Sequence, residues 1–179
     1  MPTDVRPADI RSAIAKSMPR AKSELAELVR FRSVHDPRQF PVEECVGAAQ
    51  WVQRAFVDAG IPDVQLIETS DGSLAVVGSR PAPAGAPTVL LYSHYDVQPP
   101  GDRSYWDSEP FELTERDGRW YGRGAADCKG NILMHLLALR AVGESLDVGV
   151  RIVCEGSEEM GTGGLEALVG ERPELFAAD

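Results

Sequence analysis

Cysteine is scarce in this chain, and the few cysteines follow no motif. Cys45, Cys128 and Cys154 are odd in number and widely spaced, with no C-x-x-C pair among them. Such scattered thiols do not make the framework of a disulfide-rich protein, and they are typical of a reducing compartment. The spacing also gives no support for a zinc site built from cysteines.

Long apolar runs and an apolar leader are also missing. No stretch approaches the length of a membrane span, and the start, Met-Pro-Thr-Asp-Val-Arg-Pro, lacks the apolar core of a signal peptide. We therefore predict a cytoplasmic protein with no membrane partner. Basic residues are outnumbered, 18 against 28 acidic ones, for a formal net charge of -10. This excess of acidic residues argues against nucleic acid as the main partner and favours a cation as the ligand.

Several catalytic signatures are absent from the sequence. It has no G-x-x-x-x-G-K-[ST] phosphate loop, its serines lie in no nucleophile elbow, and Gly122-x-Gly124 lacks the further glycine of a dinucleotide fingerprint. His35 and His135 stand apart, and His135 lies in an apolar helical segment, which indicates a core or helix-face role. The remaining candidates for chemistry are a histidine and several carboxylates that follow predicted strands.

Apolar periodicity and turn residues predict alternating helices and strands. With 43% hydrophobic residues, residues 1–179 are treated as one domain. Helical spacing runs from Ile10 to Val29, with a break or kink at Pro19. Further helices are predicted over 42–59, 132–142 and near 165–169, strands over 64–69, 73–78, 89–93 and 148–154, and a hairpin over 111–121. This alternation predicts an α/β sheet with helical cover.

The first polar cluster, His94 and Asp96, follows the buried-looking strand that begins at Val89. Residues two apart in an extended segment point the same way, and groups at the carboxyl end of a strand are well placed for a site. The histidine can bind a metal through one ring nitrogen while the carboxylate engages the other and fixes the tautomer. The alternative is a structural histidine whose ring nitrogens make hydrogen bonds within the protein and bind no metal.

The second cluster is a single carboxylate, Asp127, directly before a predicted helix. Its default role is that of an N-cap, which satisfies free backbone amides. A carboxylate can instead bridge two metals with its two oxygens. Arg123 and Lys129 would be its charge partners under either interpretation.

The third cluster is the pair Glu158 and Glu159, after the strand that ends at Cys154. An acidic pair is by default a solvated surface feature. Adjacent glutamates can instead divide the work, one binding a metal while the other takes a proton from water as general base.

Taken in order, four motifs resemble a known enzyme family. They are Ser93-His-Tyr-Asp-Val-Gln-Pro99, Trp106-Asp-Ser-Glu-Pro-Phe-Glu-Leu113, Tyr121-Gly-Arg-Gly-Ala-Ala-Asp-Cys-Lys-Gly130 and Glu155-Gly-Ser-Glu-Glu-Met-Gly161. The set is similar to the co-catalytic zinc metallopeptidases, which include carnosine dipeptidase, glutamate carboxypeptidase, aminoacylase and succinyl-diaminopimelate desuccinylase. The residues of these motifs look most like those of the dipeptidase branch. The resemblance extends from about Leu25 to Leu168.

The resemblance implies a metal-dependent hydrolase that cleaves dipeptides or N-acyl amino acids with a metal-bridging water. It implies an α/β catalytic domain with a mixed, mostly parallel sheet flanked by helices. Two Zn²⁺ ions, with Mn²⁺ or Co²⁺ as possible substitutes, would be held by His94, Asp127 and Glu159, with Asp127 as the bridge. Asp96 would orient His94, and Glu158 would be the general base. Cys128 stands where dipeptidases often have a second aspartate, a position that the family does not use as a ligand.

The family also uses a further acidic ligand one strand beyond the glutamate pair, and a late histidine after an inserted lid or dimerisation domain. Neither is found in residues 1–179, and Asp179 precedes the strand that the acidic ligand should follow. We therefore expect the amino-terminal part of a catalytic domain, inactive alone, whose full-length form is a homodimer through the missing domain. Two alternatives are a truncated homologue that serves as a binding or regulatory module, and an α/β domain whose acidic clusters are solvated surface.

Overall fold

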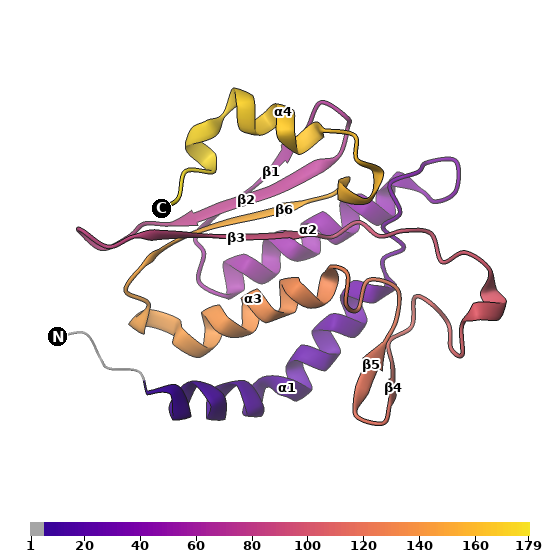
Figure 1. Ribbon diagram of the computed structural model, residues 1–179, viewed down its shortest axis with the longest axis horizontal. Helices are drawn as coiled ribbons and strands as arrows, with labels where there is room; N and C mark the ends of the chain where they lie inside the picture. Colours follow the sequence, from indigo (N-terminus) through magenta and orange to yellow (C-terminus); the bar gives the residue numbers. More distant parts are fainter. Residues whose placement is uncertain (1–5) are drawn as a thin grey trace.

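The computed structural model describes residues 6–179, and in this range a four-stranded sheet has helices on both faces (Figure 1). The strands, in spatial order, are β1 (Asp63–Glu68), β2 (Leu74–Arg80), β6 (Gly149–Glu155) and β3 (Thr88–His94). Helices α1 (Pro7–Arg30), α2 (Val42–Asp58) and α3 (Lys129–Val142) cover one face, and α4 (Gly164–Glu171) covers the other. Short helical turns are η1 (Arg103–Tyr105), η2 (Gly143–Ser145), η3 (Glu158–Met160) and η4 (Pro173–Leu175).

The predicted mixed sheet flanked by helices is confirmed. The prediction that its strands are mostly parallel is wrong for the described residues. β2 pairs antiparallel with both β1 and β6, and only β3 and β6 are parallel. The turn at Asp71-Gly72, where Gly72 has φ 81°, closes β1 and β2 into a hairpin, whereas β3 reaches β6 through a crossover that includes α3. In the parallel pair, His94 stands opposite Glu155, so both strands end at one edge.

Helix α1 continues through Pro19, although the proline bends it. A proline removes one backbone hydrogen bond and crowds the preceding turn, which kinks a helix whose two halves are held by packing. Figure 1 shows α1 changing direction partway along its length. The predicted kink is present, and the alternative of a complete break is wrong.

The core lies between the sheet and the three helices α1, α2 and α3. Its fully buried members come from all three helices and from the sheet: Leu28, Val52, Phe56, Ile132, Leu136 and Ile152. On the opposite face, α4 packs through Leu168 against Ala75 and Val77 of β2. None of the described helices is long and apolar enough to cross a membrane.

The predicted hairpin over 111–121 is present, in a shorter form. β4 (Thr114–Arg116) and β5 (Arg119–Tyr121) form a separate two-stranded sheet that turns at Asp117-Gly118, as the turn residues predict. This hairpin belongs to the long excursion between β3 and α3, so it lies outside the main sheet (Figure 1).

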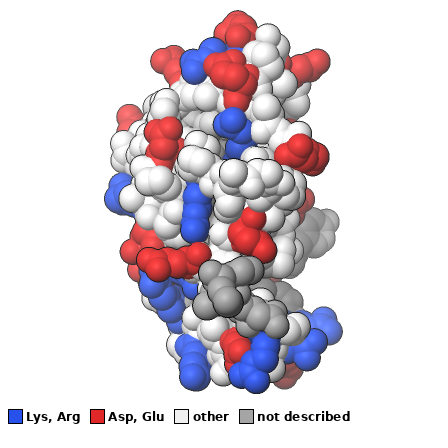
Figure 2. All heavy atoms as spheres, turned by 90° about the vertical axis from the view of Figure 1, so that its left-hand side faces the viewer, with Lys and Arg blue, Asp and Glu red and all other residues white. Residues whose placement is uncertain are grey.

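The negative net charge is not gathered on the face at which β3 begins. On this face, shown in Figure 2, acidic and basic side chains are interspersed, with basic ones more frequent near the lower end. Among the residues described there, neither sign forms a continuous surface. The acidic groups of interest lie instead where β3 and β6 end.

Candidate metal centre

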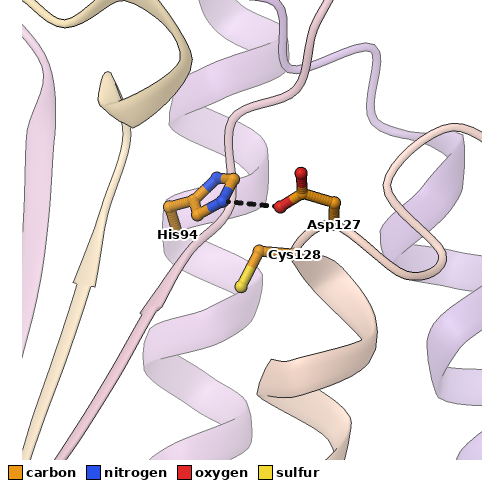
Figure 3. Close-up of side chains that lie close together, drawn as sticks. All are labelled: His94, Asp127 and Cys128. Atoms are coloured by element: carbon orange, nitrogen blue, oxygen red, sulfur yellow. Dashed lines mark hydrogen bonds and ion pairs between the residues drawn. The ribbon is translucent and has the colours of Figure 1, made fainter.

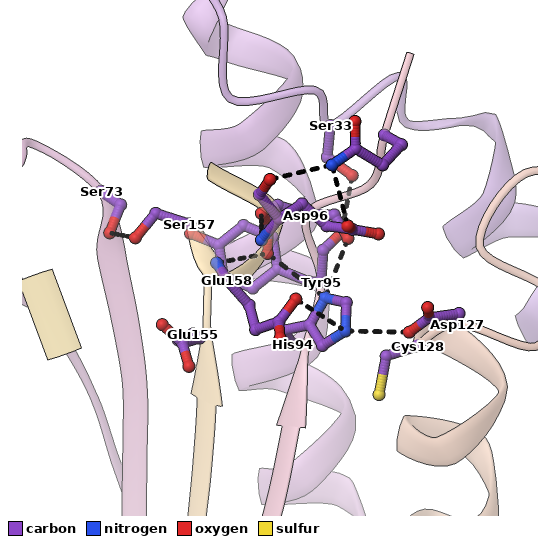
Figure 4. Close-up of polar contacts among 12 residues, drawn as sticks. Ser33, Ser73, His94, Tyr95, Asp96, Asp127, Cys128, Glu155, Ser157 and Glu158 are labelled. Atoms are coloured by element: carbon purple, nitrogen blue, oxygen red, sulfur yellow. Dashed lines mark hydrogen bonds and ion pairs between the residues drawn. The ribbon is translucent and has the colours of Figure 1, made fainter. Parts of the chain in front are cut away.

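Three separate segments meet at the carboxyl ends of β3 and β6 (Figure 4). His94 is the last residue of β3 and is only 5% exposed. Asp127 comes from the segment before α3, and Glu158 and Glu159 lie in η3, just after β6. The parallel pairing of β3 with β6 brings the histidine and the glutamates to one edge of the sheet, as expected for a site in an α/β fold.

Asp127 faces the imidazole of His94 (Figure 3). Its Oδ1 lies 3.1 Å from Nε2 of His94, while its side chain is 80% exposed. The residue at the N-cap position of α3 is Cys128, which makes no side-chain capping bond. The default role of Asp127 as an N-cap is therefore wrong, and its carboxylate is available to a ligand.

Asp96 is fully buried and joins the histidine to the glutamate loop. Nδ1 of His94 lies 3.1 Å from the carbonyl oxygen of Asp96 and 3.4 Å from its Oδ1. The backbone N–H groups of Glu158 and Glu159 donate to the two carboxylate oxygens, at 3.3 Å and 3.0 Å. The structure thus places Asp96 beside the predicted ligand, and it adds the link to the glutamates, which the sequence did not reveal.

The two glutamates have different surroundings. Oε2 of Glu158 lies 3.8 Å from Nε2 of His94, and 46% of the Glu158 side chain is exposed. Oε2 of Glu159 accepts a hydrogen bond from Nε2 of Gln98 at 3.0 Å, and the same nitrogen donates to the Glu159 carbonyl at 2.8 Å. Gln98 was not a predicted site residue, although it lies in the Asp-Val-Gln-Pro motif after β3. The Glu158 carboxylate is the less restrained of the pair.

Potential ligand atoms form two clusters in the described part of the chain. One contains His94, Asp127 and Cys128, and the other contains His94, Glu158 and Glu159; within each, the atoms lie within 4.8 Å of one another. Imidazole, carboxylate and thiolate are ligands that Zn²⁺ and neighbouring divalent metals accept. The donor set therefore fits a divalent metal, with His94 common to both clusters. The cysteine in one cluster was not expected, because the cysteines follow no metal-binding spacing in the sequence.

The contact between His94 and Cys128 shifts the pKa values of both side chains. Burial acts to lower the pKa of His94, but hydrogen bonds to Asp96 and to the Cys128 sulfur outweigh it and raise the pKa to about 11. Burial raises the pKa of the Cys128 thiol, but the adjacent His94 imidazole lowers it further, so the net shift is downward. A metal that binds the histidine nitrogen must therefore displace a proton.

Three further acidic or basic residues named in the sequence analysis lie elsewhere. Lys129 is fully buried and donates to the Phe31 carbonyl at 2.7 Å, and Arg123 donates to the Pro99 carbonyl at 3.1 Å, so their predicted pairing with Asp127 is wrong. Asp179 bonds to the backbone of Thr88, at the start of β3. The length of that strand separates it from His94 by roughly 20 Å, in agreement with its exclusion as a ligand.

Comparisons with known proteins identify the family of this chain. The model of "Peptidase family M20/M25/M40" matches residues 90–178, a range that contains every proposed ligand. A cysteinylglycine-S-conjugate dipeptidase of Corynebacterium striatum is 48% identical over 160 residues, which are 87% of this chain and 34% of the relative. Human β-Ala-His dipeptidase is 39% identical over 140 residues, 72% of this chain and 27% of the relative. The chain thus spans about a third of the length of these curated relatives, or less.

Solved structures agree with the sequence relatives. Human carnosine dipeptidase 1 superposes with a TM-score of 0.81 at 28% identity, over 92% of this chain and 38% of that chain. The di-peptidase Dug1p from Saccharomyces cerevisiae gives a TM-score of 0.82 over 92% of this chain and 37% of that chain, and at 24% identity this likeness supports the fold alone. The resemblance seen in the four motifs is confirmed: the chain belongs to the M20/M25/M40 family of peptidases.

Proposed function

We propose that this chain forms the metal-binding, amino-terminal part of the catalytic domain of a dipeptidase. The observation that carries the proposal is the convergence of His94, Asp127 and the glutamate pair into two donor clusters that share the histidine. Relatives named for cysteinylglycine conjugates and for β-Ala-His support short peptides as the substrate class, with N-acyl amino acids as a further possibility.

Each proposed ligand has a separate task. His94, Asp127 and Glu159 would hold two divalent metals, with Asp127 as the bridge, and Zn²⁺ is the ion that this donor chemistry suits well. When bound, the metals would polarise the scissile carbonyl and make a water molecule more acidic. Asp96 would hold the ring of His94 in one orientation through Nδ1, because its carboxylate is itself fixed by two backbone amides.

Glu158 is the proposed general base. Its backbone is held by Asp96 while its carboxylate stays partly exposed beside a cavity of about 430 Å³. The carboxylate would take a proton from water as the water oxygen bonds to the amide carbon, and would return it to the nitrogen as the C–N bond breaks. Homodimerisation of the full-length protein through a further domain is part of the same proposal.

A zinc titration by calorimetry tests the metal-binding part of this function. Wild type should bind Zn²⁺, and Asp127→Ala should bind at least roughly tenfold more weakly, because it loses a ligand. Asp102→Ala is the control, since Asp102 caps the exposed turn η1. Equal affinities of wild type and Asp127→Ala would contradict the assignment.

A hydrolysis assay distinguishes a dipeptidase from a binding or regulatory module. Cysteinylglycine and β-Ala-His are incubated with the zinc-loaded full-length protein and with its Glu158→Gln variant. Hydrolysis that depends on Glu158 supports the dipeptidase. Zinc binding without hydrolysis of either peptide by the full-length protein would favour the alternative of a binding or regulatory module.

A further inference from the structure

Asp71 lies in the tight turn between β1 and β2, outside both donor clusters, and yet it contacts the glutamate loop. Its Oδ1 accepts hydrogen bonds within the turn, from the Thr69 hydroxyl at 2.6 Å and from the Ser73 N–H at 3.0 Å. Its Oδ2 accepts from the hydroxyls of Ser157, at 2.7 Å, and Thr162. One oxygen therefore fixes the carboxylate in its own turn, and the other reaches a segment about 90 residues away in sequence.

The two partners on the far side, Ser157 and Thr162, lie on either side of the glutamate pair. Ser157 directly precedes Glu158, and Thr162 follows Glu159 by three residues. Ser157 is 2% exposed and also contacts the Ser73 hydroxyl at 3.3 Å, a contact visible in Figure 4. The loop that carries the proposed base and the proposed ligand is thus tied to the β1–β2 turn on both sides of the glutamates.

The first residue of α4, Gly164, permits this close approach. A Cβ atom at Gly164 would lie 2.4 Å from Oδ2 of Asp71, which is too close for any other residue without a shift. The turn that precedes it uses Gly161 and Gly163, with φ of 60° and 76°, to lead the chain back toward the sheet. The backbone of the loop is therefore shaped to receive the Asp71 carboxylate.

We propose that Asp71 is a positioning residue of the metal centre, which sets where the side chains of Glu158 and Glu159 lie through Ser157 and Thr162. Asp96 holds the middle of the loop through the two glutamate amides, and Asp71 holds its ends. Groups that orient ligands without touching the metal contribute strongly to affinity, because they prevent the ligands from adopting other conformations. The inference rests on the proposed function for the identity of the metal, whereas the order of the loop is independent of it.

The first experiment measures that order in the metal-free chain. Amide hydrogen exchange is followed by NMR over residues 157–162 in wild type, Asp71→Asn and Asp36→Asn. Asp36 is a matched control, because it is a 6% exposed aspartate whose carboxylate accepts hydrogen bonds from Arg38 and Gln39, two neighbours in its own segment. The Asp71 variant should exchange these amides roughly tenfold faster than wild type, and the control should not. If these amides exchanged in Asp71→Asn at the wild-type rate, the proposal would be overturned, whether or not the chain binds zinc.

The second experiment measures the consequence for the metal. Zinc affinity is determined by calorimetry, and the visible spectrum of bound Co²⁺ reports the coordination geometry. Asp71→Asn and Thr162→Val should bind Zn²⁺ roughly tenfold more weakly and change the cobalt spectrum, whereas Thr162→Ser keeps the hydroxyl and should restore wild-type values. An unchanged affinity in Asp71→Asn, or an equal loss in Asp36→Asn, would overturn the positioning role. Failure of wild type to bind either ion would instead overturn the proposed function.

Discussion

The carboxylate of Asp96 connects motifs that are far apart in the sequence. It lies against the ring of His94 and accepts the amides of Glu158 and Glu159, more than 60 residues further along the chain. Because it is fully buried, each of its contacts is made without competition from water. One side chain thus determines the relative position of a proposed ligand and the proposed base.

Asp96→Asn should therefore weaken zinc binding although it removes no proposed ligand. The amide has nearly the same shape, but its NH₂ group would face a backbone N–H that needs an acceptor. We expect affinity to fall about 10- to 100-fold in a calorimetric titration. Asp102→Asn, which changes an exposed turn aspartate that accepts from Ser104 at 2.8 Å, should bind like wild type. If Asp96→Asn bound zinc with wild-type affinity, Asp96 would have no role in metal binding.

Asp71 also makes the stability of the fold depend on pH. Partial burial alone would raise the pKa of Asp71, but hydrogen bonds from Thr162 and the other donors outweigh it and hold the pKa well below its usual value. A carboxyl whose pKa is depressed by folding stabilises the protein above its unfolded pKa, about 3.9, and loses this contribution as the pH falls toward the folded value.

The corresponding prediction concerns Asp71→Asn in urea unfolding. At pH 7 the variant should be less stable than wild type by about 2 kcal/mol, since it loses hydrogen bonds to a charged acceptor. The difference should narrow as the pH falls below about 4, where Asp71 of the unfolded wild-type chain takes up a proton before Asp71 of the folded protein does. A difference that stays constant between neutral and acidic pH would show that the charge of Asp71 contributes nothing.

The sequence identifies some of these residues and misses others for a physical reason. His94, Asp127 and the glutamate pair each follow a strand or precede a helix, so position and residue type mark them. The roles of Asp71 and Gln98 depend on contacts between segments distant in sequence, and no local pattern encodes such contacts. The position of Cys128 beside His94 and Asp127 was not predicted, because the cysteine signal sought in the sequence was a pair of cysteines.

At the scale of the elements, the conformation of the loop after β6 depends on Gly156, which precedes the glutamates. A Cβ atom at Gly156 would lie 2.1 Å from the hydroxyl oxygen of Tyr95. That hydroxyl donates to the Leu74 carbonyl at 2.7 Å, and Tyr95 is 1% exposed. The tyrosine therefore has no room to move away without losing its buried hydrogen bond.

Two glycine substitutions with opposite expected signs test this packing. Gly156→Ala should lower the free energy of unfolding by about 1–3 kcal/mol, because the added methyl group overfills the site. Gly170→Ala, in α4 with nothing near the added Cβ, should raise it by about 0.5–1 kcal/mol through helix propensity. Urea unfolding measures both. A neutral or stabilising Gly156→Ala would contradict the close contact with Tyr95.

Elements marked by local signals were predicted with small errors at their ends. The helix predicted over 42–59 is Val42–Asp58, and both hairpins turn at their Asp-Gly pairs. Strand direction was less predictable, because the antiparallel pairing of β2 with β6 joins segments separated by more than 60 residues. Periodicity describes which face of a strand is buried, and it does not identify the neighbouring strand.

At the scale of the whole molecule, charged groups are arranged differently at the two ends of β3. Acidic and basic side chains are interspersed on the face in Figure 2, whereas Asp96, Asp127 and the two glutamates lie around His94 at the opposite end of β3. The likeness of the fold to human carnosine dipeptidase 1 extends over 92% of the chain, and the family model matches residues 90–178. A cation is the partner that this end of the molecule suits.

The central claim is that His94 and Asp127 hold a metal together. The most direct test is an anomalous difference map, measured at the zinc absorption edge from crystals of the chain soaked in Zn²⁺. The account predicts a zinc peak about 2.0–2.2 Å from Nε2 of His94 and from a carboxylate oxygen of Asp127. Zinc bound only at other residues, or no peak between these two side chains in a zinc-saturated crystal, would contradict it.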